Sequence, residues 1–216
     1  MLQDIPTPIA DNTPEQPRVV IETERLTLRR PTLADGPAIA ALANDIRIAQ
    51  MMRRLPFPYL VEHAQQFIAA LAAQSAQGSS HGPAYGSVPG GDAAYLIEHL
   101  HVPVGVVGID WRNATTPELG YWLGCDHWGR GFATEAARAA IDVAFEQASA
   151  TEIVAVARVA NPASRNILEK CGFQWTGVEL HRFDSIGSSS PVDCFRLTRN
   201  VWSSLKNWSA ATRVEG

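Results

Sequence analysis

The sequence contains few cysteines, and the three that it has are far apart. Cys125, Cys171 and Cys194 form no C-x-x-C motif and no cluster with histidine. An odd number of widely spaced cysteines does not support a disulfide framework, and a zinc site needs a cluster of cysteine or histidine ligands, so we expect unpaired thiols and no bound metal. His99 and His101 could offer two ligands from one face of a strand, but the sequence shows no third ligand beside them.

Long apolar runs are also missing. No stretch approaches the ~18 consecutive apolar residues that a membrane-spanning helix requires. The opening residues, MLQDIPTPIADNTPEQP, carry no basic region followed by an apolar run, so they do not resemble a signal peptide. We therefore expect a cytoplasmic protein that acts without a membrane partner.

Lysine is scarce, with two lysines against sixteen arginines. The 18 basic and 22 acidic side chains give a net charge of −4, which argues against an extended nucleic-acid interface. Only 19 % of the residues are charged and 46 % are apolar, so the chain can bury a core and is not disordered as a whole. A length of 216 residues fits one domain better than two.

The pattern of apolar residues predicts a mixed α/β sheet in one domain. The proline-rich residues 1–17 are expected to form a flexible arm, and residues 77–92, with five glycines, a long loop. Thr32 followed three residues later by Asp35 marks a helix start. Alternation indicates strands at 19–29, 94–98, 104–109, 118–123, 153–157, 173–181 and 192–198, and helical periodicity indicates helices at 32–46, 61–76, 135–147 and 164–170.

The junction between one strand and the next helix carries the clearest chemical signal. Gly129 and Gly131, separated by one residue, stand just before the helix predicted from Glu135. Unpaired backbone N–H groups and the helix dipole favour an anion at such a place, and glycine lets the backbone approach it closely. The pattern is typical of phosphate or pyrophosphate binding, although a plain strand–helix turn uses glycine as well. No Gly-Lys-Ser/Thr follows, which excludes a P-loop.

The residues around this junction resemble the acetyl-coenzyme A pyrophosphate loop of the GNAT N-acetyltransferases. Trp128–Ala136 is similar to that loop, Glu118–Leu123 to the strand before it, and Asn161–Phe173 to the family's second motif. Thr23–Pro31 resembles the first strand of the ribosomal-protein-serine/alanine N-acetyltransferase branch. Three motifs in the family's order and spacing identify the chain as a member of this family.

The resemblance covers about residues 18–205, where we place the domain, and leaves 206–216 as a C-terminal tail. It implies a central twisted mixed sheet with two splayed central strands flanked by helices, and acetyl-coenzyme A as co-substrate. A bulge near Leu123 and Gly124 would turn a backbone N–H toward the thioester carbonyl. Asn161 is equally placed to cap the helix after it. The cofactor contacts implied by the resemblance are Leu123, Trp128, Gly129, Arg130, Gly131, Phe132, Ala133, Thr134, Asn161 and Arg165.

The resemblance leaves the acid and the base open. In the ribosomal-protein branch a serine donates a proton to the leaving thiolate, and Ser164 stands at the matching position, where it could also be a plain first-turn helix serine. The branch's glutamate is replaced here by Phe183. The base is therefore open between Glu118, Glu179 and Asp184, each of which could equally be a solvated surface carboxylate. No tyrosine occupies the family's usual donor position.

These observations predict a bacterial, acetyl-coenzyme A-dependent N-acetyltransferase in which a primary amine attacks the thioester directly. The first strand and Ser164 favour a protein N-terminus as acceptor, with a small amine as the other choice. Because the usual tyrosine and glutamate are missing, a catalytically silent coenzyme A-binding sensor or partner module is the alternative. Trp202 and Trp208 either pack against the domain or anchor a homodimer.

Overall fold

The computed structural model describes residues 20–76, 93–111, 116–147 and 150–214. The predicted arm at 1–17 and the predicted loop at 77–92 lie outside these ranges. No helix within the described residues is both long enough and apolar enough to cross a membrane. In the same part of the chain, no three histidine, cysteine or acidic side chains gather in a way that could hold a metal ion.

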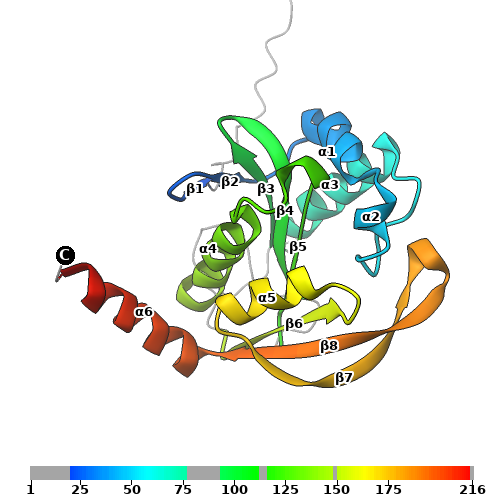
Figure 1. The fold of residues 1–216 in the computed structure, drawn as a ribbon. Helices are drawn as coiled ribbons and strands as arrows, with labels where there is room; N and C mark the ends of the chain where they lie inside the picture. Colours follow the sequence, from blue (N-terminus) through cyan, green and yellow to red (C-terminus); the bar gives the residue numbers. More distant parts are fainter. Residues whose placement is uncertain (1–19, 77–92, 112–115, 148–149, 215–216) are drawn as a thin grey trace, which may run out of the picture.

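One sheet of eight strands runs through the molecule (Figure 1). Its strands are β1 Val20–Glu22, β2 Thr27–Arg29, β3 Ala93–His99, β4 Val102–Asp110, β5 Glu118–Leu123, β6 Glu152–Arg158, β7 Gln174–Phe183 and β8 Ser188–Thr198. Their order across the sheet is β1-β2-β3-β4-β5-β6-β8-β7. Neighbouring strands are antiparallel except β5 and β6, which run parallel. The mixed sheet is therefore the predicted one.

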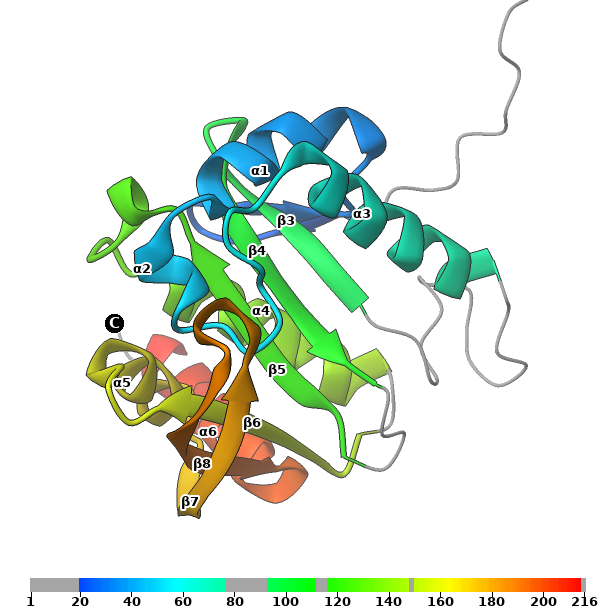
Figure 2. The same ribbon diagram turned by 90° about the vertical axis from the view of Figure 1, so that its right-hand side faces the viewer.

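Helices cover both faces of this sheet (Figure 2). They are α1 Gly36–Ala43, α2 Ile46–Ala49, α3 Val61–Ala76, α4 Phe132–Gln147, α5 Pro162–Lys170 and α6 Arg199–Val214, with 3-10 turns η1 Leu33–Asp35, η2 Cys125–His127 and η3 Asp184–Ile186. Tyr95 and Val107 join one core cluster with α4, whereas Leu96 and Val106 pack with α1 and α3 in another. Because side chains alternate along a strand, these two clusters lie on opposite faces.

The parallel strands β5 and β6 separate soon after they begin. The ladder between them has one register pair, Glu118 with Val154, near the start of both strands. Beyond that pair, backbone groups on the facing edges of β5 and β6 have no ladder partner from the other strand. The structure thus confirms the predicted fold, including the two splayed central strands.

The helix predicted at 32–46 is divided into η1, α1 and α2. The predicted capping box forms, with the Thr32 backbone N–H donating to Asp35 Oδ2 over 2.7 Å. A second acid, Asp45, then accepts from the Arg47 backbone N–H over 2.8 Å and starts α2. The Asp45 side chain therefore divides one apolar periodic run, because aspartate side chains compete with the helix for backbone N–H groups.

The last hairpin is longer than predicted. β7 continues to Phe183 and β8 begins at Ser188, so the turn consists of η3 and Gly187. Gly187 has a φ of +63°, which glycine adopts without strain and which closes this turn. Residues 188–191, which lie between the strands predicted at 173–181 and 192–198, pair along β7.

The C-terminal segment forms a helix that the sequence analysis did not predict. α6 crosses the predicted boundary between residues 205 and 206 and projects from the body of the molecule (Figure 1). Trp202 stacks on Phe145 of α4, with ring centroids 5.1 Å apart, and its indole N–H donates to Asp142 Oδ1 over 2.7 Å. Trp202 therefore packs against the domain, whereas Trp208 is 71 % exposed.

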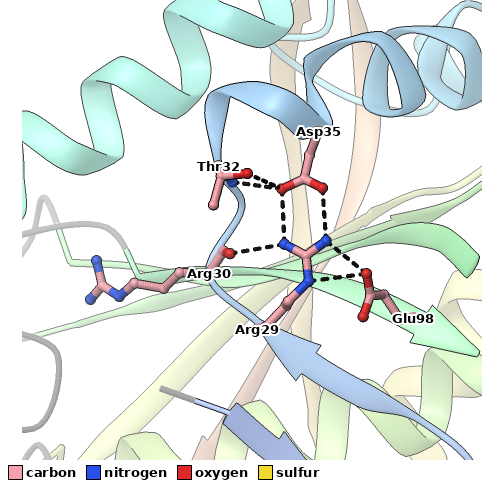
Figure 3. A network of polar contacts seen from close by, with 5 residues as sticks. All are labelled: Arg29, Arg30, Thr32, Asp35 and Glu98. Carbon is pink, nitrogen blue, oxygen red and sulfur yellow. Dashed lines mark hydrogen bonds and ion pairs between the residues drawn. The ribbon is translucent and has the colours of Figure 1, made fainter. Parts of the chain in front are cut away.

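A network of ion pairs fastens α1 to the sheet (Figure 3). Arg29 donates to both carboxylate oxygens of Asp35 over 2.8 and 2.7 Å, and to Glu98 Oε1 over 3.0 and 2.7 Å. The side chains of Asp35 and Glu98 are only 12 % and 9 % exposed, so two acids share one cation away from bulk water. Burial pushes the pKa of Asp35 upward, but hydrogen bonds from Arg29 and Thr32 outweigh it and lower that pKa to about 2.

Candidate active site

A cavity of about 970 Å³ lies where β5 and β6 separate, and residues from both faces of the sheet line it. The loop before α4 and the first turn of α5 form one side. The segment after α2 and the glycine pair of β4 and β5, Gly108 and Gly120, form the other. Of the predicted site residues, those that line this cavity are Glu118, Leu123, Trp128, Gly129, Gly131, Phe132, Ala133, Thr134, Asn161 and Ser164.

The predicted pyrophosphate loop has the geometry of an anion site. Gly129 and Gly131 have φ angles of +74° and +80°, in the left-handed region that other residues rarely adopt. α4 begins at Phe132, three residues earlier than predicted, so its first-turn N–H groups directly follow the glycines. A Cβ atom on Gly129 would meet nothing within 4 Å, which leaves open space above its backbone. The loop can therefore accept a phosphate against the positive end of α4.

Arg25 holds this loop from the turn between β1 and β2. Its Nη1 donates to the carbonyl oxygen of Arg130 over 2.9 Å, and its Nε donates to Glu135 Oε2 over 2.8 Å. The Thr23 hydroxyl donates to the same carboxylate over 2.6 Å. Burial raises the pKa of Glu135, but the bonds from Thr23 and Arg25 outweigh it and keep that pKa lowered. Arg130 itself stacks on Phe132, 4.5 Å from the ring centroid, and does not line the cavity.

The bulge predicted near Leu123 and Gly124 does not form. β4 and β5 keep a regular register from Glu118 to Leu123, and the Gly124 N–H continues it by donating to the Val104 carbonyl over 2.9 Å. In the antiparallel hydrogen-bond pattern of β4 and β5, the Leu123 N–H points away from β4. It points toward the gap where β5 and β6 separate, which we call the split. The N–H is therefore exposed to the cavity because the β5–β6 ladder ends. On the same edge, the Trp128 indole donates to the Leu123 carbonyl over 2.9 Å.

Ser164 contacts a tyrosine that the sequence analysis missed. The Tyr121 hydroxyl lies 3.0 Å from Ser164 Oγ and 3.2 Å from the Ser164 carbonyl oxygen. Burial raises the pKa of Tyr121 well above its usual value, and the hydrogen bond with Ser164 opposes that shift only partly. A protonated phenol and a hydroxyl thus lie together on the cavity wall. Side chains alternate along β5, so Tyr121 lies on the same face as Leu119 and Leu123, toward α4 and α5. This alternation could have predicted from the sequence that Tyr121 faces Ser164.

Asn161 and Arg165 flank this pair, and the structure places only Asn161 at the cavity. Asn161 caps α5 by accepting from the Ser164 backbone N–H over 3.1 Å, and it also lines the cavity, so both predicted roles are compatible. The guanidinium of Arg165 is bound instead by Glu169 at 2.9 Å and Asp193 at 3.4 Å. Arg165 therefore lies outside the cavity, paired with these two acids.

The predicted base candidates are not free carboxylates in the cavity. Glu118 Oε1 accepts a close hydrogen bond from Arg53, which also donates to His181 Nδ1 over 3.2 Å. His181 Nε2 lies 2.9 Å from Glu179 Oε2, so Glu179 belongs to the same chain of contacts. Asp184 is exposed at the hairpin turn and does not line the cavity. Arg53 was not predicted as a site residue, because no short sequence pattern shows that the segment after α2 contacts β5.

Two thiols near the site are held in the protonated form. Burial raises the pKa of Cys125 to about 11, and the neighbouring Asp45 adds to this effect. Burial likewise raises the pKa of Cys171 to about 11. Since a thiolate is the reactive form of cysteine, neither side chain is poised as a nucleophile.

Comparison with known proteins defines the class. Residues 25–174 match the family model described as an acetyltransferase (GNAT) domain. The chain belongs to the GNAT family and is a GNAT-type N-acetyltransferase. The family that the motifs resemble is thereby confirmed.

Individual relatives agree with this assignment. N-acetyltransferase p20 of Bacillus licheniformis is 30 % identical over 159 residues, which cover 72 % of this chain and 83 % of that protein. RimL, a ribosomal L7/L12 alpha-N-protein acetyltransferase solved with coenzyme A, has a TM-score of 0.68 at 18 % identity, covering 83 % of this chain and 98 % of its own. MccE, the microcin C7 self immunity acetyltransferase solved with acetyl-coenzyme A and AMP, has a TM-score of 0.66 at 22 % identity, covering 82 % and 93 %. At these identities the two structures show a shared fold.

Proposed function

We propose that this enzyme transfers the acetyl group of acetyl-coenzyme A directly to a primary amine. The observation that carries the proposal is the cavity at the β5–β6 split, which has an anion-binding loop on one side and open space over Gly120 on the other. A coenzyme that enters from the loop and an amine that enters from the opposite face would meet between the two strands. RimL and MccE, solved with coenzyme A and acetyl-coenzyme A, support this choice of co-substrate.

The residues of the loop fit the coenzyme. Backbone N–H groups from Gly129 to Ala133 would hold the pyrophosphate, with Gly129 and Gly131 leaving room for its oxygens, and Thr134 would add its hydroxyl. The Trp128 backbone N–H, also predicted to contribute, already donates to the Cys125 carbonyl over 3.2 Å. The Leu123 N–H would donate to the acyl carbonyl oxygen, where negative charge develops during attack. Acetyl-coenzyme A, when bound, supplies the activated acyl group.

Tyr121 and Ser164 would move the proton that the leaving sulfur requires. As the new C–N bond forms, the C–S bond breaks and the sulfur takes a proton from the Tyr121–Ser164 pair, which regains one from solvent. The acceptor amine gives its own proton to water, because Arg53 already engages Glu118. A protein α-amine has a pKa of about 8, so a water path suffices for such an acceptor.

The acceptor is a protein N-terminus or a small amine. The branch-like first strand and the fold shared with RimL support the N-terminus. The alternative, a silent coenzyme A-binding module, rests on the absence of the family's usual tyrosine and glutamate. Tyr121 beside Ser164 supplies a hydroxyl, and a water path can take the place of the glutamate, which favours the enzyme.

Removing the phenol should slow catalysis without weakening the cofactor complex. We expect Tyr121→Phe and Ser164→Ala each to lower kcat by about a hundredfold, the scale of general acid catalysis, while the thermal shift with acetyl-coenzyme A is kept. Because the raised pKa of Tyr121 keeps the phenol protonated, wild-type kcat should not fall between pH 7 and about 10 through loss of this donor. Thiol release measured against pH checks both statements.

Tyr95→Phe is the matched control, since Tyr95 is a buried tyrosine of β3 that lies outside the cavity. It should keep wild-type kcat. A Tyr121→Phe enzyme with unchanged kcat would remove the phenol from the mechanism.

Filling the space over Gly120 should block the acceptor and spare the cofactor. A Cβ atom there meets nothing within 4 Å, so the side chain of Gly120→Leu starts in open space and adds volume on the acceptor side of β5. We expect kcat/KM for the amine to fall about a hundredfold, because the amine is displaced from the attack position. The acetyl-coenzyme A dissociation constant should stay within twofold (about 0.4 kcal/mol) of wild type. Gly120→Ala should have an intermediate effect on kcat/KM for the amine. If Gly120→Leu weakened acetyl-coenzyme A binding as much as it lowered kcat/KM for the amine, the acceptor and the cofactor would not occupy separate sides of the cavity.

A further inference from the structure

Arg158 is the last residue of β6 and lies on the acceptor side of the split. Ile153, Ala155 and Ala157 of β6 are buried in the core cluster that includes α4, so Val156 and Arg158 face the other way. Arg158 lines the cavity, and its guanidinium lies between Gln50, which directly follows α2, and Ser190 of β8.

The Arg158 side chain is held rigidly by neutral partners. Nη1 donates to the Gln50 carbonyl over 2.7 Å, Nε donates to Ser190 Oγ over 3.1 Å, and the guanidinium lies 5.2 Å from the Phe183 ring centroid. A guanidinium has five N–H groups, so several remain available for a ligand. The three contacts come from the residue that caps α2, from β8 and from β7, so the cation is fixed before any ligand arrives.

Arg158 differs from the other arginines that line the cavity in its ion-pair partners. Arg47, Arg53 and Arg54 pair with Asp45, Glu118 and Asp110, respectively. Within the described ranges, no carboxylate forms an ion pair with Arg158. A partly buried cation without a counter-charge is unfavourable until an anion binds, and a guanidinium with N–H groups to spare suits a carboxylate.

Arg158 shares the cavity with the end of β5. Glu118 pairs with Val154, and four residues further along the two strands stand Trp122 and Arg158. The strands have separated there, but Trp122, Leu123 and Arg158 all line the same cavity. An anion bound by Arg158 would therefore occupy the cavity in which we propose that the amine attacks.

We propose that Arg158 is a specificity-determining residue that binds a carboxylate close to the reacting amine of the acceptor. This inference rests on the proposed function. The carboxylate could come from the α-carboxyl group of a free amino acid or from the acidic side chain of a peptide's first residue. Both sources present the same chemistry, a planar carboxylate near a primary amine, which a guanidinium recognises through paired hydrogen bonds.

The acceptor test uses matched pairs at saturating acetyl-coenzyme A. One pair is phenylalanine and phenylalaninamide; the other is two peptides that differ only in a first residue of glutamate or glutamine. In wild type we expect kcat/KM for the carboxylate member of at least one pair to exceed its partner by about tenfold or more, as for hydrogen bonds to a charged group. Which pair shows the difference identifies the source of the carboxylate.

Variants assign this preference to Arg158. Arg158→Gln should abolish the preference by slowing only the carboxylate member, and Arg158→Lys should restore part of it. Arg54→Gln is the control, because Arg54 is already paired with Asp110 at 2.8 Å, and it should keep the preference. A preference that survives in Arg158→Gln, or equal rates for both members of both pairs in wild type, would overturn the proposal.

A binding measurement separates this proposal from the proposed function. With coenzyme A present, N-acetylphenylalanine should bind wild type about tenfold tighter than its amide, and Arg158→Gln should bind the two equally; for the peptide source, the acetylated glutamate and glutamine peptides are compared in the same way. If the binding preference holds but no acceptor releases thiol, the transfer reaction fails and the carboxylate site stands. If all these products bind wild type without preference, the carboxylate site fails whatever the turnover.

Discussion

Gly129→Asp is expected to weaken acetyl-coenzyme A binding at least about tenfold more than Gly129→Asn does. Both side chains tolerate the left-handed conformation that Gly129 adopts at φ +74°, and neither meets an atom within 4 Å at its Cβ. The two variants therefore differ mainly in one negative charge at the mouth of the anion site. At an effective dielectric constant of about 20, like charges about 4 Å apart repel by roughly 4 kcal/mol, which is well above tenfold in affinity.

Isothermal titration with acetyl-coenzyme A measures this difference, and thermal shift provides a second readout. Gly187 is the matched control, because it has a φ of +63° and open space at its Cβ but lies in the β7–β8 turn. Gly187→Asp and Gly187→Asn should bind the cofactor equally well. If Gly129→Asp and Gly129→Asn also bind it equally, the pyrophosphate does not lie over this loop.

The features that the sequence predicted correctly are local ones. The glycines at the start of α4 and the Thr32–Asp35 capping box each involve residues a few positions apart, so a short segment is enough to determine them. Strand alternation is equally local, and it predicted the sheet and its central strands. The ends of the last two strands were predicted too short, because pairing with β7 decides the conformation of the serines after Gly187.

The site residues that were missed depend on contacts between distant segments. Tyr121 meets Ser164 across 43 positions, and Arg53 meets Glu118 across 65. These contacts depend on where β5 and β6 separate and on the path of the chain after α2, which no short pattern encodes. The bulge expected at Leu123 was wrong for the same reason, because the end of the β5–β6 ladder is a property of two strands.

Arg29→Met is expected to destabilise the fold strongly although Arg29 lies outside the cavity. Arg29 is the shared cation of Asp35 and Glu98, and its loss leaves two poorly exposed carboxylates without a counter-charge. Breaking a buried ion pair from one side costs about 3–5 kcal/mol, equivalent to a fall of about 10 °C in Tm for a chain of this size. Urea unfolding at neutral pH measures the free energy of unfolding. Arg47→Met is the control, because Arg47 is 61 % exposed in its pair with Asp45, and it should change the free energy of unfolding by less than about 1 kcal/mol.

The pH dependence of unfolding tests the cause of this loss. The pKa of Asp35 is lowered to about 2 from an ordinary value of 3.8, so its contribution to stability is fully present above pH 3.8 and disappears as the pH falls toward 2. Asp35→Asn should lack this component. In Arg29→Met the burial that raises the pKa of Asp35 is no longer opposed by the guanidinium, so protonation relieves the unpaired charge. The stability deficit of Arg29→Met should therefore shrink as the pH is lowered toward about 4.

Neutralising the acids should rescue the variant if the loss is electrostatic. Asp35→Asn and Glu98→Gln, combined with Arg29→Met, remove both unpaired charges while keeping the size of the side chains, and we expect at least half of the lost free energy to return. The side-chain amide introduced by Asp35→Asn can still accept the Thr32 backbone hydrogen bond that starts the helical segment, so the capping box is not lost with the charge. If the triple variant is no more stable than Arg29→Met, the guanidinium acts through its packing between β2, β3 and η1. In that case the charge of the network does not fasten α1 to the sheet.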